Sequence, residues 1–142
     1  MKFNGYIREN GKVGIRNYVL VMSSVGCANN VTERIAAETG THPITHQQGC
    51  LQLGIDQALT KKMLIGAANN PNVGAVLIVG LGCETIQPSL IAAEVRGKPV
   101  EYITIQECGG TSKTVQKGVE IVRDLQRKIA GQKREPVDIS HL

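Results

Sequence analysis

The sequence predicts an α/β domain of Rossmann-like, three-layer architecture, with a four-stranded, mainly parallel sheet between helices and a β-hairpin at the N-terminus. Four short predicted strands, three of them rich in Val, Ile and Leu, alternate with segments predicted to be helices, which is typical of a parallel sheet. A glycine-containing loop follows each predicted strand. The length of 142 residues suits one domain. The 42% hydrophobic and 20% charged fractions are those of a globular protein, which excludes disordered and fibrous classes.

The N-terminal half predicts a hairpin, two strands and a helix. Residues 5–16 are expected to form the hairpin, turning at Asn10–Gly11, because this dipeptide favours tight hairpin turns. Residues 18–23 are a continuous apolar run, typical of a strand buried on both faces. A helix over 31–38 and a brief strand over 42–46 follow.

The C-terminal half continues the alternation. Helices are expected over 53–69, 87–96 and 115–129, and strands over 74–79 and 100–105. By analogy with doubly wound folds, we expect the four strands in the spatial order 2-1-3-4.

Helix ends are indicated by capping residues. Asn30, with Glu33 three residues later, is expected to cap the first helix, and Gly40 to end it. Thr111 is expected to cap the last helix.

The predicted domain organisation has three parts. Residues 1–17 form a hairpin packed on the domain, residues 18–130 form the α/β domain, and residues 131–142 form a linker toward a C-terminal domain that this chain lacks.

Composition excludes several function classes. The net charge is +4, and much of the surplus lies in residues 12–16 and 123–134, which we interpret as solvated surface. With no Trp, one Phe and three Tyr, the chain lacks the aromatic residues that nucleic-acid binding uses, so no nucleic-acid partner is expected.

No apolar run reaches the ~18–20 residues of a membrane span, and no signal segment begins the chain, so we expect a cytoplasmic protein. Neither a Gly-x-Gly-x-x-Gly nor a Gly-Lys-Ser/Thr motif occurs, so no nucleotide cofactor is expected.

Each of the four cysteines follows the carboxyl end of a predicted strand. These are Cys27, Cys50, Cys83 and Cys108, and none belongs to a C-x-x-C pair. The same edge of the sheet gathers polar residues, namely His46, Gln47, Gln48, Glu84, Gln106, Glu107 and Thr111. Open α/β sheets bind ligands at this edge, so the pattern predicts a small-molecule site. The alternative is that the cysteines act as small buried hydrophobes.

Individual side chains keep two interpretations each. His46 suits a proton transfer or a metal ion, or a structural hydrogen bond. Glu84 suits a ligand carboxylate or a partner of a helix N-terminus. Gln106 and Thr111 suit ligand orientation or helix capping.

Four segments of the chain resemble the altronate/galactarate dehydratase family, which includes the large subunit of sulfolactate sulfo-lyase. They are Gly5–Asn17, Thr45–Cys50, Val79–Glu84 and Gln106–Thr111. The resemblance implies metal-dependent removal of water from a sugar acid, giving a 2-keto-3-deoxy acid. It also implies a divalent metal, Fe²⁺ in the usual description with Mn²⁺ as an alternative. In one branch, sulfite leaves instead of water.

The resemblance also implies site residues. The expected catalytic residues are His46 and Glu84, and the expected metal ligands are Cys50 and Cys83. The expected substrate-binding residues are Arg16, Gln47, Gln106, Gly109, Gly110 and Thr111. Arg16 either pairs with the carboxylate of the acid or is an ordinary solvated arginine of the hairpin.

Family members are much longer, so this chain resembles one truncated domain of such an enzyme. We expect as partners a hydroxy-carboxylate substrate, the remaining domains or subunit of the same enzyme, and a second copy in a homo-oligomer. Alone, the chain is expected to be inactive. Two alternatives stay open: a fragment of a sulfolactate sulfo-lyase large subunit, and a non-catalytic module that binds a small anion or a partner.

Overall fold

The computed structural model of the protein describes residues 1–142 and contains a four-stranded parallel sheet with the order β4-β3-β5-β6. The strands are β3 (Tyr18–Ser23), β4 (His42–Ile44), β5 (Val73–Gly80) and β6 (Val100–Thr104). All three strand pairs are parallel. The predicted order 2-1-3-4 is therefore confirmed.

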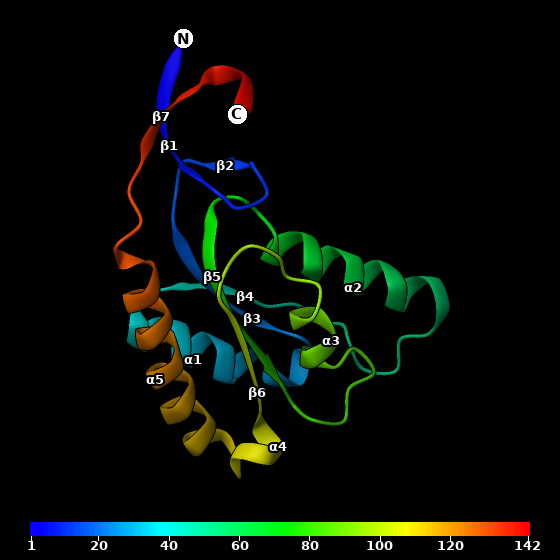
Figure 1. Cartoon of the computed structure of the whole chain (residues 1–142). Coiled ribbons are helices and arrows are strands. Elements are labelled where there is room, and N and C mark those ends of the chain that lie inside the picture. Colours follow the sequence, from blue (N-terminus) through cyan, green and yellow to red (C-terminus); the bar gives the residue numbers. More distant parts are fainter.

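Helices cover both faces of this sheet, as the sequence predicts (Figure 1). The helices α1 (Asn29–Thr39) and α5 (Thr111–Ala130) pack on one face. The helices α2 (Gly54–Ala68) and α3 (Pro88–Ala92) pack on the other. The chain thus forms three layers.

The central strand β5 is buried along its whole length because both faces are covered. Its alternate side chains enter two separate apolar clusters, since successive strand residues point to opposite faces. Ala75, Leu77 and Val79 join the cluster beneath α1 and α5, whereas Val76 and Ile78 join the cluster beneath α2 and α3. A continuous apolar run is the sequence pattern that this arrangement requires.

Two predicted helix starts are wrong. The helix α1 begins at Asn29, after the short 3₁₀ turn η1 (Gly26–Ala28), and Asn30 lies inside it rather than capping it. Thr111 is the first residue of α5, whose N-cap is Gly110. A one-turn helix that the sequence did not indicate, α4 (Ile105–Cys108), precedes it. The expected end of α1 is confirmed, since Gly40 adopts the left-handed conformation there.

A second, three-stranded sheet stands above the first in Figure 1 and contains both ends of the chain. The predicted hairpin is present as β1 (Lys2–Ile7) and β2 (Val13–Gly14), and Gly11 in its turn has a φ of 76°. The segment expected to be a linker instead contains β7 (Glu135–Asp138), which pairs with β1, followed by the short turn η2 (Ile139–His141).

Arg8 connects this small sheet to the α/β layers. Its side chain is buried, and its guanidinium donates hydrogen bonds to the carbonyls of Pro71 and Arg16 and to the side chains of Asn17 and Gln132. No acidic side chain forms an ion pair with it, and burial lowers its pKa. Hydrogen bonds to neutral groups therefore hold this cation in place.

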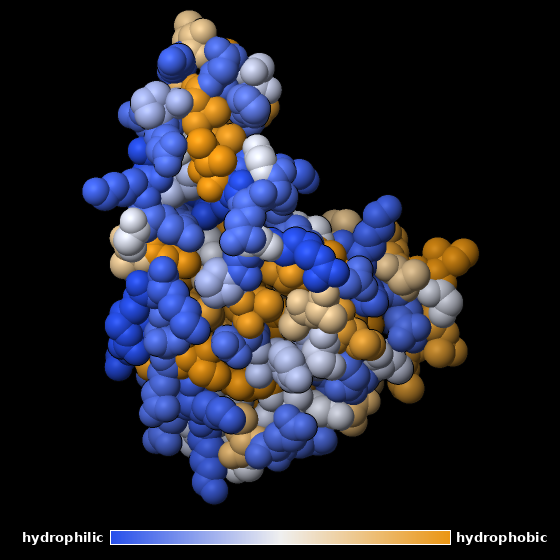
Figure 2. All heavy atoms as spheres, viewed as in Figure 1, coloured by the Kyte–Doolittle hydropathy of each residue, from blue (hydrophilic) through white to orange (hydrophobic).

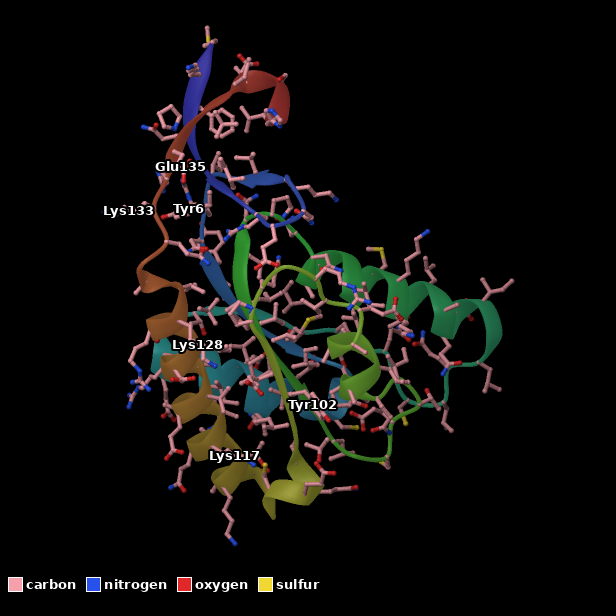
Figure 3. All side chains as sticks on the ribbon, viewed as in Figure 1. Tyr6, Tyr102, Lys117, Lys128, Lys133 and Glu135 are labelled. Carbon is pink, nitrogen blue, oxygen red and sulfur yellow. The ribbon has the colours of Figure 1, made fainter.

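The basic residues of α5 lie on its exposed face, as expected for solvated charge. Lys117 and Lys128 are both exposed, and their positions along the helix are visible in Figure 3. The ammonium of Lys128 lies 3.1 Å from a carboxylate oxygen of Asp124, one turn earlier. No helix of the chain has the length and apolar character needed to cross a membrane.

Candidate active site

The loops that follow β3 and β4 are hydrogen-bonded to each other at the carboxyl edge of the sheet. The backbone N–H of Gly26 donates to the carbonyl of Gln48 at 2.9 Å. The side-chain amide of Asn29 donates to the carbonyl of His46 at 2.8 Å. These contacts bring the segments of Cys27 and Cys50 to one edge.

The loop after β5 joins the same edge. The hydroxyl of Ser24 donates to Glu84 Oε1 at 2.8 Å, which links it to the loop after β3. The hydroxyl of Thr85 lies 3.4 Å from the carbonyl oxygen of Gly49, in the loop after β4.

The segment after β6 completes the arrangement. The backbone N–H of Gln106 donates to the carbonyl of Leu81 at 3.0 Å. The Gln106 side chain packs so closely against Gly82 that a Cβ there would collide with its amide, and Gly82 has a φ of 128°. We call the four joined segments, residues 23–29, 45–53, 80–87 and 104–111, the rim. The predicted convergence of the four loops is confirmed.

His46 has both ring nitrogens engaged. Its Nε2 lies 3.0 Å from the carbonyl oxygen of Ser23, and its Nδ1 accepts the backbone N–H of Gln48 at 3.1 Å. Since a carbonyl oxygen can only accept, the proton is on Nε2 and the ring is the neutral tautomer. Asn29 holds His46 and Ser23 together, because its amide donates to the His46 carbonyl and its Oδ1 accepts the Ser23 hydroxyl at 2.7 Å. The imidazole is held at the end of β4 in one orientation.

Glu84 is buried, and both its carboxylate oxygens are occupied. Oε1 accepts the Ser24 hydroxyl and the Leu81 N–H at 3.0 Å, and Oε2 accepts the Gly82 N–H at 2.6 Å. A carboxylate that accepts backbone N–H groups within its own loop fixes the loop's shape. Here it also ties that loop to the end of β3.

The four cysteines are free thiols at the rim, three of them exposed and Cys108 half-buried. They are not sealed among aliphatic side chains, so their interpretation as small buried hydrophobes is wrong for the three exposed ones. No three His, Cys, Asp or Glu side chains converge so as to hold a metal ion. The donors of this chain do not make up a full ligand set by themselves, and the role of Cys50 and Cys83 as metal ligands stays a prediction.

The expected substrate-binding residues divide into two groups. Gln47, Gln106, Gly109 and Thr111 are exposed and Gly110 is half-buried, all within the rim. Arg16 is not among them: its backbone N–H donates to Asn72, directly before the amino end of β5, whereas the rim lies at the carboxyl end. The sheet separates Arg16 from the other candidates.

Sequence reasoning missed three residues that organise these elements, namely Ser24, Asn29 and Arg8. Ser24 and Asn29 lie in the loop after β3, where small polar residues are common and their partners are distant in sequence. The only available signal was their position beside Cys27, at the carboxyl end of a predicted strand.

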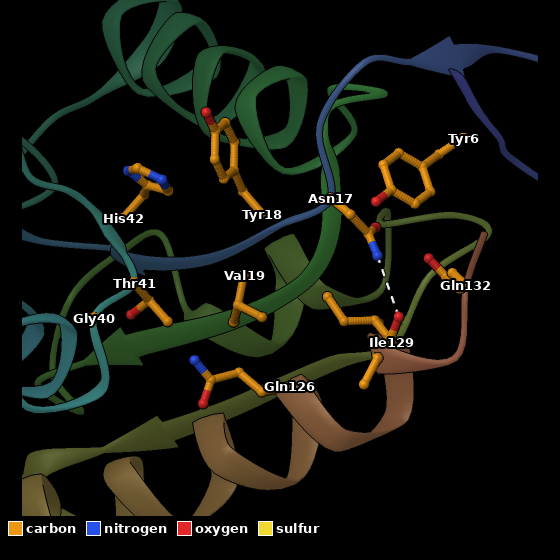
Figure 4. A pocket seen from close by; sticks show the side chains of 11 residues that line it. Tyr6, Asn17, Tyr18, Val19, Gly40, Thr41, His42, Gln126, Ile129 and Gln132 are labelled. Atoms are coloured by element: carbon orange, nitrogen blue, oxygen red, sulfur yellow. Dashed lines mark hydrogen bonds between the residues drawn. The ribbon is translucent and has the colours of Figure 1, made fainter. Parts of the chain in front are cut away.

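A hollow of about 430 Å³ lies at the opposite, amino edge of the sheet (Figure 4). Tyr6, Tyr18 and His42 border it, and the Tyr18 and His42 rings meet edge to face with their centroids 4.0 Å apart. None of the rim residues lines it. The hollow and the rim are separate features of the chain.

The fold and the rim together define a Rossmann-like domain that presents its polar, thiol-bearing loops at the carboxyl edge of a parallel sheet. A family model described as "D-galactarate dehydratase/Altronate hydrolase, second domain" matches residues 5–130. The chain belongs to this family.

Curated relatives agree with the family assignment. The chain is 32% identical to an altronate dehydratase of Bacillus subtilis and 33% identical to one of Escherichia coli, over 99% and 96% of its length. It is 36% identical to the (2R)-sulfolactate sulfo-lyase subunit beta of Chromohalobacter salexigens, over 99% of its length. These alignments cover 30%, 30% and 36% of the relatives, so the chain spans about a third of their length.

Proposed function

We propose that this chain contributes part of the active site of a sugar-acid dehydratase of the altronate/galactarate type, a hydro-lyase that forms a 2-keto-3-deoxy acid and water. The observation that carries the proposal is the rim. Its four segments are separated in sequence and hydrogen-bonded together at one edge, and three of them overlap the family-like segments Thr45–Cys50, Val79–Glu84 and Gln106–Thr111. The relatives named as altronate dehydratases support the substrate class.

The reaction makes one physical demand on the site. Removing the proton next to a carboxylate creates an enediolate with two negative charges, which needs hydrogen bonds or a cation for stabilisation. At the rim, the N-terminus of α5 has no side-chain cap and no acidic residue in its first turn. Its free N–H groups suit the carboxylate of the acid.

We assign the proton transfer to His46. Its Nδ1 holds the lone pair that can accept a proton, and the Gln48 N–H occupies that lone pair in the present arrangement. The loop after β4 must therefore shift at Gln48 when substrate binds. The Gln48 N–H then leaves Nδ1, and the substrate proton that is to be transferred takes its place.

We assign Glu84 a positioning role instead of a catalytic one. Only 4% of the residue is exposed, and three donors already occupy its oxygens. Its contribution is to hold the loop of Cys83 against the loop after β3.

The expected metal, Fe²⁺ or Mn²⁺, needs ligands from outside these 142 residues, because this chain brings no three suitable donors together. Cys50 and Cys83 are the thiols that it offers toward such a centre.

A second candidate reaction is the removal of sulfite from sulfolactate. The observation in its favour is the 36% identity to a sulfo-lyase subunit, over nearly the whole chain. Both reactions begin with the loss of a proton beside a carboxylate and differ in the group that then leaves.

The test uses a reconstituted enzyme, in which this chain replaces the matching segment of the Bacillus subtilis altronate dehydratase. Altronate, galactarate and (2R)-sulfolactate are supplied separately, and 2-keto acid and sulfite are measured. We expect 2-keto acid from a sugar acid. Sulfite release from sulfolactate alone would assign the second reaction to the chain. Binding of the acids without turnover of any of the three would show that the chain is a non-catalytic binding module.

The 142-residue chain by itself serves as the control. We expect no turnover of any of the three acids, because the rim lacks the groups that the other two thirds of the relatives supply. Appreciable 2-keto acid production by the isolated chain would contradict this expectation.

A further inference from the structure

The start of α2 and the loop before it expose a group of large apolar side chains. We call them the α2 apolar surface; with their exposed fractions, they are Leu51 (87%), Leu53 (78%), Ile55 (84%), Leu59 (56%) and Met63 (68%). Orange spheres gather over this part of the molecule, at the right of Figure 2. Single exposed apolar residues are ordinary, but five large ones within thirteen positions, three of them on one helix face, indicate an interaction surface.

The periodicity of α2 explains how the surface forms. Ile55, Leu59 and Met63 are spaced four residues apart, so they lie along one face of the helix. Only Leu64 and Ala68 of this helix are buried in the domain. By contrast, α5 buries its apolar residues against the sheet and exposes a charged face. The helix α2 therefore has apolar area on two faces, of which the domain covers one.

The α2 apolar surface continues into the rim. A groove of about 360 Å³ between α2 and the edge strand β4 is lined by Leu59 and Met63 on one side and by His46 and Gln48 on the other. Whatever covers the exposed face of α2 also closes this groove beside His46. Excluding water there is what a proton transfer next to a carboxylate needs.

We propose that the α2 apolar surface is the docking surface for the remainder of the enzyme, meaning the polypeptide that corresponds to the two thirds of the relatives that this chain does not cover. The matched family model is a second domain, so the family's proteins contain at least one other. The polypeptide of those other domains must pack on this domain somewhere. The α2 apolar surface is the exposed apolar surface that adjoins the rim. The proposal rests on family membership and not on the reaction, so the two can fail separately.

Methionine oxidation tests the proposal without an activity measurement. Met63 is 68% exposed in this chain, whereas Met22 is fully buried and serves as the protected control. Hydrogen peroxide converts an accessible methionine to its sulfoxide. The sulfoxide at each position is measured by peptide mass spectrometry, relative to added N-acetylmethionine, in the isolated chain and in the reconstituted enzyme.

We expect Met63 to react near the rate of N-acetylmethionine in the isolated chain and at least tenfold more slowly in the reconstituted enzyme. Equal rates in the two proteins would overturn the proposal, even where the reconstituted enzyme is active. Protection of Met63 in the isolated chain at high concentration, lost on dilution, would assign the surface to a second copy of this chain instead.

A binding experiment supplies a second readout. The part of the Bacillus subtilis enzyme outside the matched segment is co-expressed with this chain, and the affinity of the purified pair is measured by calorimetry. Ile55→Lys with Met63→Lys is expected to weaken binding at least a hundredfold. The control pair Ile7→Lys with Tyr102→Lys, two half-exposed residues elsewhere, is expected to leave it unchanged. Equal affinity for both variants, or no complex with the unmodified chain, would overturn the proposal.

Discussion

The substitution Glu84→Gln tests whether one buried carboxylate holds the loop after β5 in place. The carboxylate accepts hydrogen bonds from the Ser24 hydroxyl and from the N–H groups of Leu81 and Gly82. Glutamine has nearly the same shape, but one of its two terminal atoms is an NH₂ group, which cannot accept. In either orientation of the amide, the part-buried backbone N–H of Leu81 or of Gly82 faces another donor.

The magnitude follows from these contacts. A hydrogen bond to a charged group contributes about 1.5–3 kcal/mol, and a part-buried N–H that faces another donor loses that contribution. Losing one such bond while the others weaken therefore lowers the free energy of unfolding by about 2–3 kcal/mol. For a chain of 142 residues, an unfolding entropy of about 2.1 cal/mol/K per residue converts this to a fall in Tm of roughly 7–10 °C.

Thermal unfolding followed by circular dichroism measures the effect. The matched control is Glu101→Gln, at an exposed glutamate of β6, where we expect a change within about 0.5 kcal/mol. Hydrogen exchange should show faster exchange at Leu81 and Gly82 in Glu84→Gln alone. A fall in Tm no larger than that of the control would refute the assigned role of Glu84.

Two other predictions concern the junction between the two sheets. Arg8→Met removes four part-buried hydrogen bonds, two of them to the backbone carbonyls of Pro71 and Arg16, so we expect urea unfolding to show a loss of about 2–4 kcal/mol; an unchanged urea midpoint would contradict this. Burial, assisted by the charge of Arg8, lowers the pKa of Lys98 to about 8. Between pH 8 and 10.5 the unfolded chain therefore holds a proton on Lys98 that the folded chain has released, and stability rises with pH in this window. We expect the free energy of unfolding, measured relative to Lys98→Met, to increase from pH 8 to pH 10.5 and to be constant below pH 7; a free energy that stays constant or falls across the window would show that the lysine is not desolvated.

The sheet was predictable because its signals are local. The two central strands, β3 and β5, are short apolar runs, and the run at Val73–Gly80 is buried along its whole length. The elements that the sequence did not indicate depend on distant partners. The strand β7 contains Pro136, has one buried residue, and forms by pairing with β1 at the other end of the chain. Arg8 follows a strand beside a turn, and nothing in the local pattern indicates that it is buried.

The candidate site divides in the same way. The carboxyl ends of parallel strands share one edge, so the meeting of the four loops follows from the common direction of the strands. The role of each side chain cannot be predicted from the strands in this way. Asn30 has the pattern of a helix cap, but Asn29 is the residue that makes the long-range contact, to His46 seventeen positions away. Glu84 was expected to be catalytic, and its partner Ser24 lies sixty residues earlier.

The most direct test of the rim as the active site is a comparison of two variants in the reconstituted enzyme. His46 lies at the rim and Arg16 at the opposite edge of the same sheet. With altronate as substrate, we predict that His46→Ala lowers kcat by about 10²–10⁴-fold, the contribution of a positioned base, whereas Arg16→Ala leaves kcat within about twofold. Loss of activity in Arg16→Ala with full activity in His46→Ala would place the chemistry at the other edge and contradict the account.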